Sequence, residues 1–179
     1  MRILGIDPGF AIVGWGVVEY SGSRFKTIAY GSIQTPAGMR IEERLAKIHE
    51  QMNLLFETYH PDAMAIEELF FNNNITTGIR VAEARGVILV SAEEHEVPIA
   101  EYTPSQVKQA VVGYGKAEKK QIISMVTMLL GLAEPPKPDD TADALAIAIC
   151  CCTPRTRSAY SVCCRRIILS LFWRTKSST

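Results

Sequence analysis

The chain of 179 residues is long enough to bury a sizeable apolar core, and this length favours one compact domain over two. Its 47% hydrophobic and 21% charged residues exclude an intrinsically disordered chain. The longest apolar run near the end, residues 167–173, is far shorter than the about 20 residues that span a bilayer. The amino terminus lacks the pattern of a secretory leader, so we expect a cytoplasmic protein with no membrane contact.

The net charge of zero hides an uneven distribution along the chain. Residues 1–149 hold 13 basic against 19 acidic residues, a net charge of −6, whereas residues 150–179 hold six basic residues and no acid. Non-specific affinity for nucleic acid comes mainly from neutralised phosphates, so an acidic body is poorly suited to binding DNA through bulk charge. Binding DNA would require a local basic strip, or metal ions that invert the charge of an acidic cluster.

Hydrophobic periodicity predicts an α/β fold with a five-stranded mixed sheet, in which an antiparallel meander continues into parallel strands flanked by helices. The predicted elements, in chain order, are strands at 2–7, 12–20 and 25–34, a helix at 39–59, a strand at 63–66, a helix at 77–94, a strand at 99–102, and helices at 104–112, 118–131 and from Asp139 or Asp140 onward. Turn residues and prolines separate these elements, and no internal repeat or second-domain boundary interrupts them.

The end of the chain differs in character from the rest. All five cysteines lie here, at positions 150, 151, 152, 163 and 164, without the paired spacing of zinc sites, and we interpret them as incidental thiols. Beyond Thr153 no periodicity remains, so we divide the chain into a domain at 1–153 and a basic, cysteine-containing tail without regular structure at 154–179. The tail is either foreign to the domain, through a shifted reading frame or a fusion, or a basic arm for DNA.

Four carboxylates stand at predicted strand ends and at a helix start. Asp7 ends the first strand in Gly-Ile-Asp-Pro-Gly, Glu67 follows the buried strand at 63–66, and Asp140 and Asp143 share one face of the last helix. Each alone also has a structural explanation, as a turn residue, a solvated loop acid or a helix cap. Gathered at one edge of a sheet, however, the four acids would repel one another unless cations lay between them. Hard oxygen ligands favour Mg²⁺, with Mn²⁺ able to substitute, and two such ions can hydrolyse a phosphodiester.

Four motifs from Arg2 to about Ile149 resemble the RuvC-type crossover junction endodeoxyribonucleases. They are Gly-Ile-Asp7-Pro-Gly, Ala-Ile-Glu67-Glu-Leu-Phe70, the stretch from Gln106 to Lys119, and Asp140-Thr-Ala-Asp143-Ala-Leu-Ala-Ile-Ala. The resemblance implies an RNase H-like fold and a Mg²⁺-dependent endonuclease that nicks four-way (Holliday) junctions symmetrically in DNA recombination and repair. It also implies a homodimer with two active sites and a branch-migration helicase complex as partner.

The resemblance assigns roles to individual residues. The catalytic and metal-binding acids would be Asp7, Glu67, Asp140 and Asp143, and Lys108 and Lys119 would act near the scissile phosphate. The residues expected to contact DNA are Phe70, Phe71, Arg80, Arg85, Lys108, Lys116, Lys119 and Lys120. Phe70 would stack on a base at the junction centre, and the helix at 77–94 would be the dimer element.

Structural alternatives remain open for these residues. The two lysines Lys108 and Lys119 also suit ordinary helix surface, and Phe70 also suits the core, with Phe71 then exposed. Arg80 and Arg85 could pair with Glu83 and its neighbours instead of phosphates. The apolar stripe of the helix at 77–94 is explained equally well by packing within one chain.

Three other functions share parts of this pattern. Gly-Ile-Asp-Pro-Gly also resembles the first phosphate loop of actin-like ATPases and sugar kinases, but those proteins need two lobes, for which this chain is too short. A non-catalytic junction-binding module would use the acids structurally. A ribonuclease H acting on RNA–DNA hybrids would share the acid cluster, and only the motifs around Phe70 and Lys119 distinguish it.

Overall fold

The computed structural model describes residues 1–22, 24–69 and 75–153. The elements in this part are β1 (Arg2–Asp7), β2 (Ile12–Ser21), β3 (Arg24–Gln34), α1 (Ile41–Tyr59), β4 (Ala63–Glu67), α2 (Ile75–Glu94), β5 (Ile99–Tyr102), α3 (Pro104–Val112), α4 (Lys119–Leu129) and α5 (Asp139–Cys152). Every predicted element is present, and the predicted ends agree within two residues. None of the helices in the described ranges is long and apolar enough to cross a membrane.

The strands form one sheet in the order β3-β2-β1-β4-β5. The pairs β1–β2 and β2–β3 are antiparallel, which confirms the predicted meander. The pairs β1–β4 and β4–β5 are parallel; α1 leads the chain from β3 into β4, and α2 makes the crossover from β4 to β5. The mixed five-stranded sheet is therefore confirmed.

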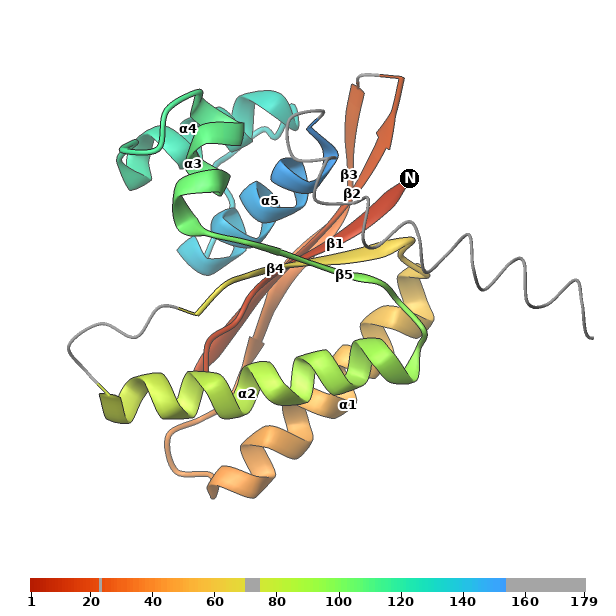
Figure 1. Cartoon of the computed structure of the whole chain (residues 1–179), viewed down its shortest axis with the longest axis vertical. Coiled ribbons are helices and arrows are strands. Elements are labelled where there is room, and N and C mark those ends of the chain that lie inside the picture. The colour runs from red at the N-terminus through yellow and green to blue at the C-terminus, as the bar shows by residue number, and fades with distance from the viewer. Residues whose placement is uncertain (23, 70–74, 154–179) are drawn as a thin grey trace, which may run out of the picture.

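Helices cover both faces of the sheet, with α1 and α2 on one side and α3, α4 and α5 on the other (Figure 1). Alternation along β1 divides its side chains between two cores: Ile3 belongs to the core beneath α3–α5, whereas Leu4 and Ile6 belong to the core above α1 and α2. Asp7 has the parity of Ile3, so it lies on the face that α5 covers.

Helix α5 lies closely on the sheet because small residues face each other across the contact. A Cβ atom built on Gly5 of β1 would lie 2.1 Å from the carbonyl oxygen of Ala144, so only glycine fits at this position. Nearly all of α5 after its first turn is buried. This seating fixes the start of α5 relative to the ends of β1 and β2.

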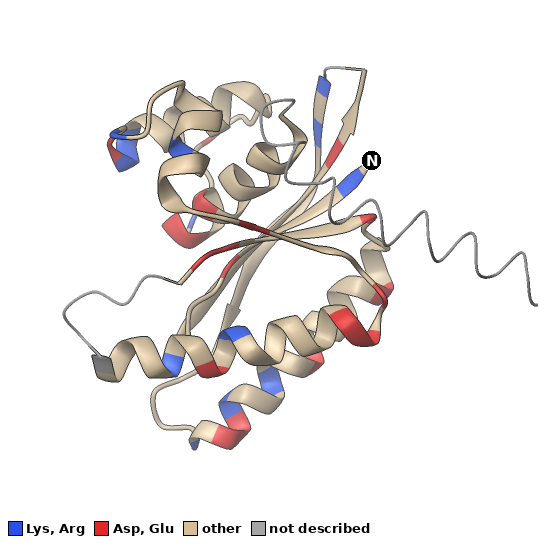
Figure 2. Cartoon of the chain, in the orientation of Figure 1, with Lys and Arg blue, Asp and Glu red and all other residues tan. Residues whose placement is uncertain are grey.

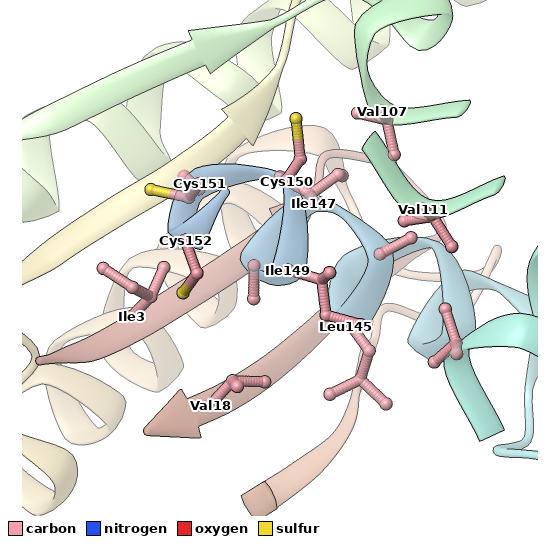
Figure 3. Packing of buried hydrophobic residues seen from close by; sticks show 14 of the residues in the cluster. Ile3, Val18, Val107, Val111, Leu145, Ile147, Ile149, Cys150, Cys151 and Cys152 are labelled. Atoms are coloured by element: carbon pink, nitrogen blue, oxygen red, sulfur yellow. The ribbon is translucent and has the colours of Figure 1, made fainter. Parts of the chain in front are cut away.

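Cys150, Cys151 and Cys152 are core residues at the end of α5, packed near Ile3 of β1 (Figure 3). Burial, followed by the neighbouring thiols, raises the pKa of Cys150 to about 12, which keeps this thiol protonated. The interpretation of these cysteines as incidental thiols did not include a packing role. In the core a buried thiol behaves as a small apolar side chain. Cys163, Cys164 and the tail at 154–179 lie outside the described residues, so the predicted domain division stays a prediction.

Candidate active site

Four acidic side chains that are far apart in sequence meet at one edge of the sheet. β1 and β4 are parallel neighbours in which Ile6 pairs with Ile66, and the next residue of each strand is Asp7 or Glu67. The first turn of α5, which packs against β1 and β2, brings Asp140 and Asp143 to the same place. Figure 2 shows acidic residues gathered around the ends of these strands and the start of α5.

The electrostatics of Asp7 show how closely the acids are grouped. Burial, then the charges of Asp143, Glu67 and Asp140, raise the pKa of Asp7 to about 7, with Lys119 opposing the rise. Burial, then the charge of Asp143, likewise raises the pKa of Glu67, and here Lys108 opposes the rise. Asp7 therefore lies within the electrostatic range of the other three acids, and two lysines supply positive charge to the cluster.

Lys119, the first residue of α4, reaches into the cluster. Its Nζ lies 3.1 Å from Oδ2 of Asp143 and 3.4 Å from Oδ2 of Asp139. Burial lowers the pKa of Lys119, but the hydrogen bond and charge of Asp143 outweigh this effect, and the pKa rises overall. The pKa of Asp143 is nevertheless raised, because its own burial outweighs the attraction of Lys119. Asp139 was absent from the predicted site, although its place beside Asp140 at the helix start was a signal for it.

The donor chemistry of the cluster fits a divalent cation, because carboxylate oxygens are the ligands that Mg²⁺ and Mn²⁺ prefer. Asp7 is largely buried, yet no hydrogen-bond donor contacts its carboxylate within the described ranges, so a cation would satisfy its charge. In the described part of the chain, however, no three acidic, histidine or cysteine side chains are arranged to hold a metal ion. In this arrangement the ammonium group of Lys119 balances part of the negative charge of the cluster.

Two of the predicted DNA-contacting lysines, Lys108 and Lys119, belong to this cluster. Lys108 of α3 is half-buried and close enough to Glu67 to lower its pKa, so it belongs to the site itself. Lys116 and Lys120 are exposed, before and within the first turn of α4. Phe70 and Phe71 lie outside the described residues, so their predicted base contacts stay predictions.

The two predicted arginines of α2 both form ion pairs. Nη1 of Arg80 lies 2.9 Å from Oε2 of Glu83 one turn along the helix, as the alternative interpretation expected. Arg85 pairs with Glu101 of β5, and its side chain is only 15% exposed. Arg80 keeps enough exposure to contact a phosphate, whereas the burial of Arg85 favours a structural tie between α2 and the sheet.

Comparison with known proteins agrees with this geometry. The family model described as crossover junction endodeoxyribonuclease RuvC matches residues 3–151. The crossover junction endodeoxyribonuclease RuvC of Brevibacillus brevis is 62% identical over 149 residues, which cover 83% of this chain and 90% of that protein. The match reaches Cys151, two residues beyond Ile149, where the resemblance was expected to end.

Solved structures show the same relationship. T. thermophilus RuvC in complex with Holliday junction substrate superposes with a TM-score of 0.81 at 38% identity, covering 84% of this chain and 92% of that chain. The yeast mitochondrial Holliday junction resolvase Ydc2 shares the fold, with a TM-score of 0.60 at 14% identity over 83% of this chain and 78% of that chain. With an RNase H-like fold and a family match over most of its length, the chain belongs to the crossover junction endodeoxyribonuclease RuvC family.

Proposed function

We propose that the chain resolves four-way DNA junctions by metal-dependent, paired nicks during recombination and repair. The observation that carries this proposal is the convergence of Asp7, Glu67, Asp140 and Asp143 at one sheet edge, where burial and then the neighbouring charges raise the pKa of Asp7 to about 7. A structural role alone gives no reason to bury Asp7 among like charges. The relative from T. thermophilus was solved with a Holliday junction substrate, which supports the choice of DNA.

The four acids would hold two Mg²⁺ ions, which supply an activated water and stabilise the leaving oxygen of the phosphodiester. The protein's own contribution is to place these carboxylates on rigid strand ends and a buried helix. Lys108, beside Glu67, is positioned to bind a nearby phosphate as a point charge. Lys119 balances the charge of Asp143 until the substrate and cations arrive. Lys116 and Lys120 are exposed before and within the first turn of α4, and they would add positive charge for the DNA backbone there.

The proposed homodimer is supported by an apolar groove between α1 and α2. The groove has a volume of about 470 Å³, and its lining includes Leu45, Val87 and Val90. Ala84 and Ile88 of α2 are fully buried in the core, whereas Ile79 is 50% exposed and Val90 54% exposed. Thus α2 packs against its own chain and still offers apolar residues to a second copy, which would present two active sites to one junction.

The dimer proposal is tested by replacing Val90 with glutamate. We expect Val90→Glu to sediment as a monomer and to lose paired nicking, because the charge would be buried in the interface. Leu54→Glu on α1 is a matched control, since Leu54 is 53% exposed but lies outside the groove lining. A dimeric Val90→Glu protein would contradict this interface.

The family resemblance also supports a branch-migration helicase complex as partner and the cytoplasm as the place of action. A resolvase acts on junctions that such a helicase moves, so the two activities are expected together. Pull-down with and without junction DNA would test the association.

Cleavage is tested with three substrates: a synthetic four-way junction, a linear duplex and an RNA–DNA hybrid, each with and without Mg²⁺. We expect paired nicks on the junction only, and only with Mg²⁺. Cleavage of the hybrid would indicate a ribonuclease H instead. Junction binding without any cleavage would indicate a non-catalytic module.

A further inference from the structure

Arg44 of α1 is a buried cation on the face of the sheet opposite α5, only 9% exposed. Its guanidinium group lies 3.8 Å from the centroid of the Phe10 ring. Nε donates to Oγ1 of Thr35 over 2.9 Å, and Nη2 donates to the carbonyl oxygen of Phe10 over 3.2 Å. No carboxylate of the described residues pairs with it. Burying a charge without a carboxylate partner costs free energy, so the hydrogen bonds and the ring contact of Arg44 must offset that cost.

Thr35, at the end of β3, completes the same arrangement. Its hydroxyl accepts from Arg44 and donates to the carbonyl oxygen of Phe10 over 2.6 Å. Its backbone N–H donates to the carbonyl oxygen of Ala11 over 2.9 Å. Two consecutive carbonyl groups of one loop are therefore held by β3 and α1 together.

The loop held in this way is the connection that follows Asp7. Phe10 and Ala11 lie three and four residues after Asp7, and Asp7 itself pairs with Gly14, the third residue of β2. The Asp7 carboxylate receives no hydrogen bond from the described residues, so its position depends on its backbone. The sheet holds Asp7 from the β1 side, and whatever holds this loop fixes the backbone on its other side.

We infer that Arg44, Thr35 and Phe10 form a clamp that positions Asp7 for metal binding. The clamp residues do not touch the substrate; they act through the loop at residues 8–11. An apolar side chain in place of Arg44 would also pack on Phe10, but it would offer no directional bond to the loop. Replacing buried charges with apolar groups is often neutral for stability, so the fold alone does not explain the cation. The inference rests on the proposed metal site.

The test compares Thr35→Val with Thr35→Ser in the full-length chain. Valine keeps the shape of threonine and removes the hydroxyl, whereas serine keeps the hydroxyl. We expect Thr35→Val to weaken Mn²⁺ affinity, measured by titration calorimetry, by about tenfold, the lower end of the loss that follows removal of a hydrogen bond made directly to a metal ligand. The Mg²⁺ concentration for half-maximal junction cleavage should rise by the same factor. Thr35→Ser should match the wild type in both measurements, and junction affinity without metal should stay unchanged in both variants.

Two further variants keep the test decisive. Thr127→Val removes a hydroxyl that bonds only within α4, and it should leave Mn²⁺ affinity unchanged. Arg44→Lys keeps the charge and loses the forked contact, so it should weaken Mn²⁺ binding even if Thr35→Val fails to fold. A folded Thr35→Val protein with wild-type Mn²⁺ affinity and a lowered Tm would overturn the clamp. A wild-type protein that binds no Mn²⁺ would overturn the metal site and the clamp together.

Discussion

Gly14 of β2 lies directly against the backbone of Asp140: a Cβ atom on Gly14 would lie 2.0 Å from the Asp140 carbonyl oxygen. Gly14 also pairs with Asp7 across β1 and β2, so the three residues form one row from the strand to the helix. The obstructing atom belongs to the backbone of α5, which must move as a whole to make room. The position of Asp140 and Asp143 relative to Asp7 therefore depends on the absence of a side chain at Gly14.

Gly14→Ala should displace the start of α5. We expect a loss of about 1–3 kcal/mol in unfolding free energy, as for other overpacked sites. Cleavage should fall by about 100-fold, the cost of misplacing a catalytic group by about 1 Å. Denaturant unfolding and junction cleavage measure the two effects. Gly38→Ala is the control, because its Cβ would meet nothing within 4 Å. Normal cleavage by Gly14→Ala would show that α5 tolerates the shift.

Asp7→Asn should abolish cleavage and, without metal, stabilise the protein. The wild-type carboxyl group has a pKa of about 7 in place of 3.8, so ionising it at pH 8 opposes folding. At about 1.4 kcal/mol per pKa unit, the gain on removing this acid is at most about 4 kcal/mol. Thermal unfolding in EDTA at pH 8 measures the gain, with exposed Glu57→Gln as control. A destabilised Asp7→Asn protein would argue against a strained acid cluster.

The stability of the metal-free protein should fall as the pH rises from about 4 to about 7. In this range folded Asp7 still holds a proton that the unfolded chain has lost, so raising the pH favours unfolding. The raised pKa values of Glu67 and Asp143 act in the same direction. Saturating Mg²⁺ should flatten this dependence, because a cation then replaces the proton. Calorimetric scans across the range, with Asp7→Asn for comparison, check the prediction; equal slopes for both proteins would refute it.

Lys119→Met should lower cleavage by about 100-fold or more, the typical cost of losing one group that stabilises developing charge. It should also leave Asp143 and Asp139 without their ammonium partner. Single-turnover cleavage at saturating Mg²⁺ separates this effect from junction binding. Lys26→Met on β3 controls for the loss of one exposed positive charge. If both variants cut equally well, Lys119 has no role in the chemical step.

The sequence predicted the parts of the site that depend on local periodicity. Alternation along β1 indicates which face Asp7 occupies, and helical spacing places Asp140 and Asp143 together. The contact between Lys119 and Asp143 joins the starts of two helices. Periodicity within each helix does not predict how the ends of two helices are placed relative to each other. The clamp of Arg44 was missed for the same reason, because a cation on an amphipathic helix is expected in solvent. Helix α5 continues through the cysteines that Figure 3 labels, and their apolar character extends the preceding alanine-rich run.

The two-sided sheet separates two tasks within one small domain. The acid cluster lies on the side of the sheet that α3, α4 and α5 cover, whereas the apolar groove lies on the other side, between α1 and α2. Each layer has its own core, so the exposed groove residues can vary without repacking the side that carries the acids. The buried part of α1 lacks this freedom, because Arg44 ties it to the loop that follows Asp7.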